Sequence, residues 1–120
     1  MTELPIAGGT DPMVLLLDIM RQLRDPDSGC PWDLRQDFHT IVPFTIEETY
    51  ELADAIASGD FSQVCDELGD VLFQVVFYAQ MASERRLFDF ADVAEGIAQK
   101  LLRRHPHVFA RNSDEPVSEA

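Results

Sequence analysis

Carboxylates are concentrated in one stretch of the sequence, from Thr40 to Ser83, which contains no Lys, Arg or His. Read as a helix at about 100° per residue, the first part of the stretch places four carboxylates within one arc of about 120°. In the second part, two more carboxylates lie three residues apart and share one helical face. These side chains are Glu47, Glu48, Glu51 and Asp54 in the first part, and Glu67 and Asp70 in the second.

This acidic pattern needs positive charge from outside the stretch. Like charges four residues apart, such as Glu47 and Glu51, destabilise a helix by about 0.2–0.5 kcal/mol, and burying unpaired carboxylates costs more. The short connection at residues 59–61 makes the two helices antiparallel neighbours, so the two acidic groups can face each other. Carboxylate oxygens are hard ligands that suit Mg²⁺ or Mn²⁺. The pattern therefore indicates a divalent metal site, and the alternative is a solvated acidic face paired with arginines from elsewhere.

A di-iron carboxylate site is disfavoured by the positions of the histidines. Such sites use Glu-x-x-His pairs on their helices. The three histidines of the sequence are expected outside the carboxylate-bearing helices, at His39, His105 and His107.

A cluster of cations lies towards the end of the sequence, where Lys100, Arg103 and Arg104 share one helical face. Arginine binds phosphate oxygens through a fork of N–H groups, and lysine acts as a point charge. A cationic patch beside an acidic metal site suits a polyphosphate ligand that the metal bridges. The same residues near a helix C-terminus also complement the helix dipole, and the sequence leaves both roles open.

The single tryptophan, Trp32, lies in a turn-rich segment, Gly29-Cys30-Pro31-Trp32-Asp33. An aromatic ring presented by a loop can stack on a nucleobase. A tryptophan in such a segment can also be an apolar plug beneath the loop. The sequence leaves these two roles open as well.

The elements that must position these side chains are helices, which predicts an all-α fold with a bundle of four to five helices. Thr10 or Asp11, followed by Pro12, marks the start of a first helix. Thr45 with Glu48 forms a capping box that opens a second. Residues 25–45 contain several Gly and Pro residues and are expected to form an ordered loop or short helical turns. The expected helices span residues 12–23, 45–58 with Gly59 as C-cap, 62–84 capped by Ser62, and 90–104 capped by Asp89.

The helix expected over 62–84 is apolar almost all the way round in its second half, from Val71 to Ala79. A helix of this kind must be covered on several faces. Four helices of a 120-residue chain can hardly bury all faces of this helix. A partner subunit is therefore expected to cover the rest, and the predicted assembly is a homodimer. The alternative is that this is the central helix of a monomer.

Length and composition narrow the class of protein further. The 120 residues predict one domain at 11–110, with a flexible lead-in at 1–10 and a flexible tail or the start of a linker at 111–120. A net charge of −13 excludes a simple basic nucleic-acid binder and disfavours an anionic membrane surface. No apolar stretch is long enough to span a bilayer, and no signal-peptide pattern is visible. We therefore expect a cytoplasmic protein with no nucleic-acid or membrane partner.

Four blocks of sequence, taken together, resemble the MazG nucleotide pyrophosphohydrolase family. The residues Glu47-Glu48-Thr49-Tyr50-Glu51, followed by Glu67-Leu68-Gly69-Asp70, are similar to the EExxE…ExxD signature of that family. Residues 23–33, 69–77 and 100–109 agree with it in the same order. The resemblance covers about residues 13–109, and the four blocks in this order are far more specific than the acidic signature alone.

The resemblance implies an all-α, dimeric fold that hydrolyses nucleoside triphosphates, NTP or dNTP, to the monophosphate and pyrophosphate with Mg²⁺. Mn²⁺ is a possible substitute for that ion. It implies roles for residues of three kinds: metal ligands at Glu48, Glu51, Glu67 and Asp70, an outer ligand or base for water at Glu47, and substrate contacts at Lys100, Arg103, Arg104 and Trp32. Many members carry two such domains in tandem. The alternative function is therefore a catalytically weak or inactive nucleotide-binding and dimerisation module of a larger protein.

Overall fold

The computed structural model describes residues 11–109, and these residues form helices joined by short connections. The predicted all-α class is confirmed, with four long helices and two of only four residues. In chain order the helices are α1 (Pro12–Leu23), α2 (Pro31–Leu34), α3 (Phe38–Ser58), α4 (Phe61–Glu84), α5 (Phe90–Arg104) and α6 (Pro106–Phe109). The lead-in predicted at 1–10 and the tail predicted at 111–120 lie outside the described residues.

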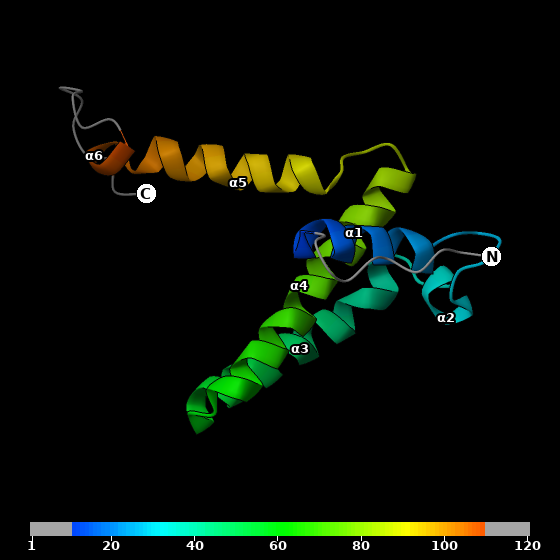
Figure 1. The fold of residues 1–120 in the computed structure, drawn as a ribbon, viewed down its shortest axis with the longest axis horizontal. Helices are drawn as coiled ribbons and strands as arrows, with labels where there is room; N and C mark the ends of the chain where they lie inside the picture. The colour runs from blue at the N-terminus through cyan, green and yellow to red at the C-terminus, as the bar shows by residue number, and fades with distance from the viewer. Residues whose placement is uncertain (1–10, 110–120) are drawn as a thin grey trace.

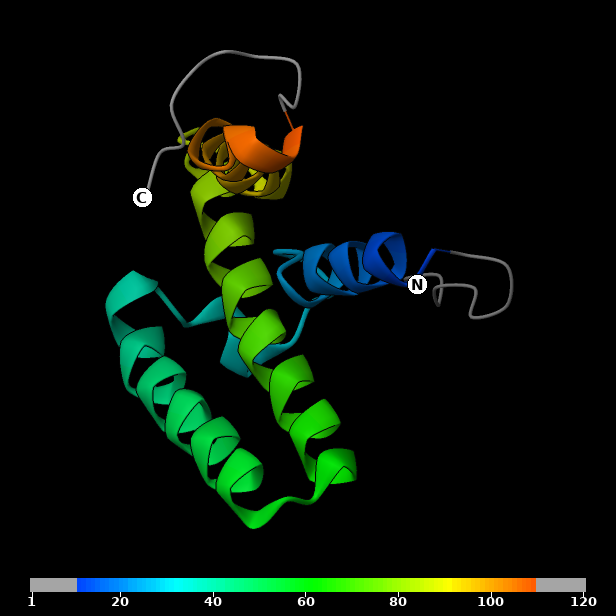
Figure 2. The same ribbon diagram turned by 90° about the vertical axis from the view of Figure 1, so that its left-hand side faces the viewer.

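The helices α3 and α4 form an antiparallel hairpin, which is seen side by side in Figure 2. Gly59 ends α3 in the left-handed conformation, at φ 76°, as its predicted role as C-cap requires. The predicted cap of α4 at Ser62 is wrong, because Asp60 is the N-cap and α4 begins at Phe61. The Asp60 carboxylate follows the turn directly and accepts a hydrogen bond from the Gln63 amide at 3.2 Å.

The start of α3 also differs from the prediction, because the helix begins at Phe38 and not at Thr45. Asp37 and Thr40 form a capping box. The Asp37 carboxylate accepts from the Thr40 amide at 2.9 Å, and the Thr40 hydroxyl accepts from the Asp37 amide at 2.8 Å. This box satisfies two amides of the first turn, which the later Thr45 pattern cannot do.

Pro43 lies inside α3 and does not end it. A proline within a helix costs about 3 kcal/mol, and the burial of Ile41 in the core on the same stretch offsets part of that cost. Because α3 starts early, His39 lies on a carboxylate-bearing helix, against the prediction. It precedes Glu47 by two turns and forms no Glu-x-x-His pair, so the argument against di-iron stands.

The core lies where α1 crosses the α3–α4 hairpin, as Figure 1 shows. It is built from buried side chains of these three helices, namely Met20, Ile41, Val76, Phe77 and Met81. α4 supplies three of the five, which makes it the central helix of the chain. No helix of residues 11–109 is long and apolar enough to cross a membrane.

The helix α5 leaves the rest of the chain and extends along the top of Figure 1. It begins at Phe90 and is capped by Asp89, as predicted, and the Asp89 carboxylate accepts from the Asp92 amide at 2.9 Å. None of its residues is buried, although Ile97 and Leu101 are large and apolar. A helix with an uncovered apolar face of this kind needs a surface to pack on.

The hairpin, too, presents large apolar side chains to solvent. Of the carboxylates of α3, Glu48 faces α4. The opposite side of α3 points outwards with Ile46 and Tyr50 exposed, and Ile56 is exposed as well. Tyr50 is 68% exposed and Phe61 on α4 is 80% exposed. Exposed apolar side chains of this size are candidates for contact with another surface.

Candidate metal centre

Three carboxylates from two helices meet between α3 and α4. Glu48 on α3, and Glu67 and Asp70 on α4, each place one carboxylate oxygen within 4.8 Å of the others. We refer to these three residues as the carboxylate cluster. Glu67 is buried, Glu48 is half-buried and Asp70 is exposed, so the cluster opens to solvent on one side.

Two oxygens of the cluster lack hydrogen-bond partners. Glu48 Oε2 and Glu67 Oε2 are both buried, and neither accepts a hydrogen bond from the residues described. The other oxygen of Glu67 accepts from Gln63 Nε2 at 2.6 Å. A buried carboxylate oxygen without a partner is costly. A divalent cation would satisfy both oxygens, and an all-oxygen donor set suits Mg²⁺ or Mn²⁺, so the residues present fit such an ion.

The cluster also raises the pKa of its own members. Burial, and next the negative charges of Glu51 and Asp70, raise the pKa of Glu48 from 4.5 to about 7. Burial raises the pKa of Glu67, although its hydrogen bond from Gln63 acts in the opposite direction. In the absence of a cation, Glu48 is therefore partly protonated near pH 7, and its proton must be released when a metal ion binds.

Of the five acidic residues predicted for the site, Glu51 and Glu47 lie outside the cluster. Glu51 is exposed at its rim, close enough to raise the pKa of both Glu48 and Glu67. Glu47 is exposed on α3 and is not one of the carboxylates that meet in the cluster.

The alternative of an acidic face neutralised by arginines has no support among residues 11–109. The ion pairs in this range join Arg21 to Asp18 and Arg24 to Glu84, and neither involves the cluster. The cations predicted as a phosphate clamp also lie elsewhere. Lys100, Arg103 and Arg104 are exposed on α5, which Figure 1 shows leading away from the α3–α4 hairpin.

An aromatic pocket of about 270 Å³ adjoins the cluster. Its lining residues come from α2, α3 and α4 and are Trp32, Ile41, Phe44, Glu48, Asp70, Phe73, Gln74 and Phe77. Trp32 is 42% exposed, and its ring meets Phe44 edge-on with ring centroids 5.5 Å apart. The tryptophan is therefore a wall of this pocket rather than a plug in the core.

The short helix α2, which carries Trp32, is held in place by Arg24. This guanidinium donates through Nη1 to the carbonyl oxygens of Asp33 at 2.6 Å and Gln36 at 3.1 Å. Through Nε and Nη2 it donates to the Glu84 carboxylate at 3.0 and 2.5 Å. Sequence reasoning missed this residue, because 60 positions separate Arg24 from Glu84 and no local pattern joins them.

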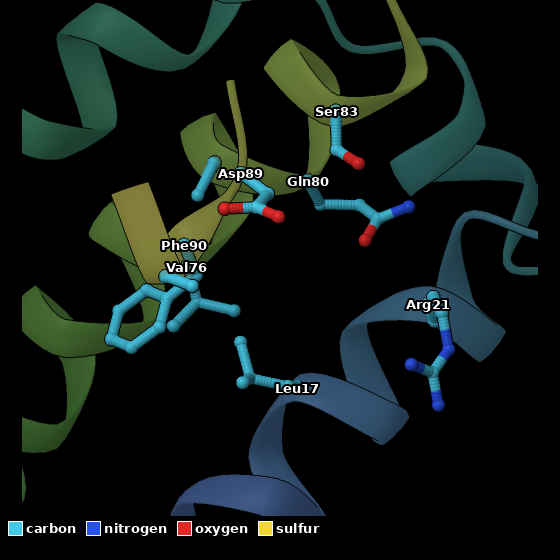
Figure 3. A pocket seen from close by; sticks show the side chains of 9 residues that line it. Leu17, Arg21, Val76, Gln80, Ser83, Asp89 and Phe90 are labelled. Carbon is cyan, nitrogen blue, oxygen red and sulfur yellow. The ribbon is translucent and has the colours of Figure 1, made fainter. Parts of the chain in front are cut away.

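A second pocket of about 270 Å³ lies between α1, α4 and the start of α5. Figure 3 shows Arg21, Gln80 and Ser83 around it. The one carboxylate that lines it, Asp89, already caps α5. This pocket therefore lacks the set of free carboxylates that a metal site requires, and the cluster between α3 and α4 is the candidate centre.

The fold and the site define a class of protein, an all-α protein that carries carboxylates on an antiparallel helix pair. Residues 36–109 match the family described as the MazG nucleotide pyrophosphohydrolase domain. The chain belongs to this family, as its resemblance predicted.

Similar proteins come from several bacteria. A nucleoside triphosphate pyrophosphohydrolase of Escherichia coli (strain K12) is 62% identical over 104 residues, which are 87% of this chain and 40% of the relative. A nucleoside triphosphate pyrophosphohydrolase/pyrophosphatase MazG of Thermotoga maritima is 50% identical over 94 residues, 78% of this chain and 36% of the relative. The chain thus spans less than half the length of these curated relatives. A crystal structure of a mazG-related protein from Thermotoga maritima matches with a TM-score of 0.66 at 27% identity, covering 86% of this chain and 85% of the other.

Proposed function

We propose that this chain hydrolyses nucleoside triphosphates to the monophosphate and pyrophosphate, with Mg²⁺ held by the carboxylate cluster and Glu51. The observation that carries the proposal is the pair of buried, unpartnered oxygens on Glu48 and Glu67. They lie beside an aromatic pocket in a chain of the MazG family. Relatives named as nucleoside triphosphate pyrophosphohydrolases support the choice of substrate.

Different residues of the chain would bind the metal ion, orient the attacking water and bind the base. Glu48, Glu51, Glu67 and Asp70 would hold the cation, which when bound lowers the pKa of water and stabilises charge that develops on phosphorus. Glu47 would act as an outer ligand or as a base for water. Trp32 would contact the base. Phosphoryl transfer depends mostly on positioning and electrostatics, so no covalent residue is needed.

A homodimer is part of the proposal, because the chain alone leaves apolar faces of α3, α4 and α5 uncovered. Within one chain, Lys100, Arg103 and Arg104 are not in contact with the carboxylates. These cations can neutralise a pyrophosphate leaving group only if an α5 helix lies near the carboxylates. In a homodimer, the α5 helix of the partner subunit could take that position.

Pyrophosphate release from a panel of NTPs and dNTPs, with Mg²⁺, Mn²⁺ or EDTA, tests the reaction. We expect metal-dependent release that Glu67→Gln and Glu48→Gln each reduce at least 100-fold. Asp66→Asn is the matched control, since Asp66 adjoins Glu67 on α4 but is exposed and outside the cluster. Release that survives EDTA, or the double variant Glu48→Gln/Glu67→Gln, would show that the metal assignment is wrong.

A second candidate is a nucleotide-binding and dimerisation module with weak or no turnover. The short span of the chain relative to its curated relatives favours keeping this candidate. A module of this kind shows a rise in melting temperature with Mg²⁺ and nucleotide but no pyrophosphate release.

A further inference from the structure

Gln74 is a polar side chain in the apolar half of α4, and it is only 7% exposed. It lies one helical turn after Asp70 and two turns after Glu67, on the same side of the helix. Together with Asp70, it lines the aromatic pocket. In the sequence it interrupts an apolar run, from Val71 to Ala79.

A hydroxyl pair fixes the orientation of the Gln74 side chain. The Thr45 hydroxyl lies 2.9 Å from Gln74 Oε1 and donates to it. The Tyr78 hydroxyl lies 2.6 Å from Thr45 Oγ1, and it must donate there because Thr45 has a single proton to give. A longer contact of 3.3 Å from Thr45 to the Ile41 carbonyl competes less well. The ring of Tyr78 stacks on Phe38, which holds the pair in place.

This arrangement uses the oxygen of the carboxamide and leaves its nitrogen free. Gln74 Nε2 donates to none of the described residues, and the other walls of the pocket are aromatic rings, two carboxylates and the aliphatic side chain of Ile41. The free group is a donor that solvent still reaches, because the buried unpartnered side-chain atoms of the described residues are the Glu48 and Glu67 oxygens. A ligand that fills the pocket and excludes solvent must supply an acceptor to this donor, since a second donor would leave it desolvated without a partner.

We propose that Gln74 determines base specificity by donating a hydrogen bond to an exocyclic carbonyl oxygen of the base. The inference rests on the proposed function, because it assigns the aromatic pocket to the base of the nucleoside triphosphate. Aromatic side chains stack on any base through its π-face, so the discrimination between bases comes from the Gln74 carboxamide. Bases with a keto group at the position reached are bound better than bases with an amino group there.

Two matched pairs of substrates isolate this difference. UTP and CTP differ in an oxo or amino group on the pyrimidine, and ITP and ATP differ in the same way on the purine. We expect kcat/KM to favour UTP over CTP, and ITP over ATP, by about 3- to 10-fold, the effect of one neutral hydrogen bond. Gln74→Met keeps the unbranched shape and removes the donor, and should bring both ratios close to one.

A second variant tests the network without touching the carboxamide. Thr45→Val removes the hydroxyl that donates to Gln74 Oε1. The Gln74 carboxamide can then turn either its oxygen or its nitrogen towards the pocket, so the UTP/CTP and ITP/ATP ratios of kcat/KM should both fall. Gln80→Met is the matched control, because Gln80 lies on α4 outside this pocket and donates to Glu84 instead. It should leave both ratios unchanged. Melting temperatures of all three variants show whether each is folded.

Binding of the α,β-imido analogues of UTP and CTP, measured by calorimetry with Mg²⁺, separates this inference from the proposed reaction. Tighter binding of the UTP analogue, lost in Gln74→Met, supports the inference even if no pyrophosphate is released. Hydrolysis without any keto preference overturns the inference and leaves the reaction intact. If Gln74→Met lowers kcat/KM equally for all four nucleotides, the residue acts in packing and the inference is wrong. The inference is also wrong if neither analogue binds.

Discussion

Glu48→Gln should stabilise the metal-free protein at alkaline pH. The pKa of Glu48 is raised from 4.5 to about 7 in the folded chain, so the carboxylate opposes folding once it is ionised. The penalty is absent below pH 4.5, where the carboxyl is protonated in both states, and it is complete above pH 7. At 1.36 kcal/mol per pKa unit the shift amounts to roughly 3 kcal/mol, and solvent at the open side of the cluster reduces this to about 1–2 kcal/mol.

Thermal unfolding in EDTA at pH 5 and pH 8 measures this effect. A gain of about 1–2 kcal/mol corresponds to a rise in melting temperature of about 4–8 °C for a domain of this size. The rise should be seen at pH 8 and largely vanish at pH 5. Saturating Mg²⁺ should reverse the order, because the wild-type chain gains binding energy that the variant loses.

The control for this prediction is Glu47→Gln, which removes a neighbouring carboxylate that is exposed on the same helix. It should shift the melting temperature little at either pH. A Glu48→Gln variant that melts lower than wild type at pH 8 in EDTA would refute the reasoning, as would an equal rise at pH 5 and pH 8.

Three further results are expected. Apparent Mg²⁺ affinity, measured by calorimetry, should rise as pH increases through about 7, because Glu48 must lose its proton to bind the ion; a flat profile contradicts this. Arg24→Met should free α2, raise KM more than it lowers kcat and shift the fluorescence of Trp32 to the red, whereas an unchanged KM would remove Arg24 from this role. Tyr50→Glu on the exposed face of α3 should convert a dimer to monomers in light scattering, and a mass that does not change would place the interface elsewhere.

The sequence was sufficient to predict the class of fold and the meeting of the carboxylates, for a simple reason. Helical periodicity fixes which side chains share a face, and the short turn at Gly59 forces α3 and α4 to lie antiparallel. These two local facts bring Glu48 opposite Glu67. The metal ligation by these residues stays a prediction.

Other features depend on contacts that no local pattern records. The capping box at Asp37 competes with the one at Thr45, and the burial of Ile41 decides between them only once α1 and α4 are in place. Arg24 donates hydrogen bonds to Glu84, which lies 60 positions away in the sequence. The direction of α5 depends on the turn after α4, so the cationic face of that helix was predictable while its distance from the carboxylates was not.

The continuity of α4 has a consequence for how the substrate specificity of this protein can evolve. Asp70 and Gln74 lie on one uninterrupted helix of 24 residues, so the rise of 1.5 Å per residue holds the proposed metal ligand and the proposed base-binding group about 6 Å apart along the axis. The regular geometry of the helix fixes the spacing between the two positions. A one-residue insertion between the two positions would turn the second by about 100° and out of the pocket, so new preferences are reached by exchanging side chains at fixed positions, and rarely by changing the length of the chain.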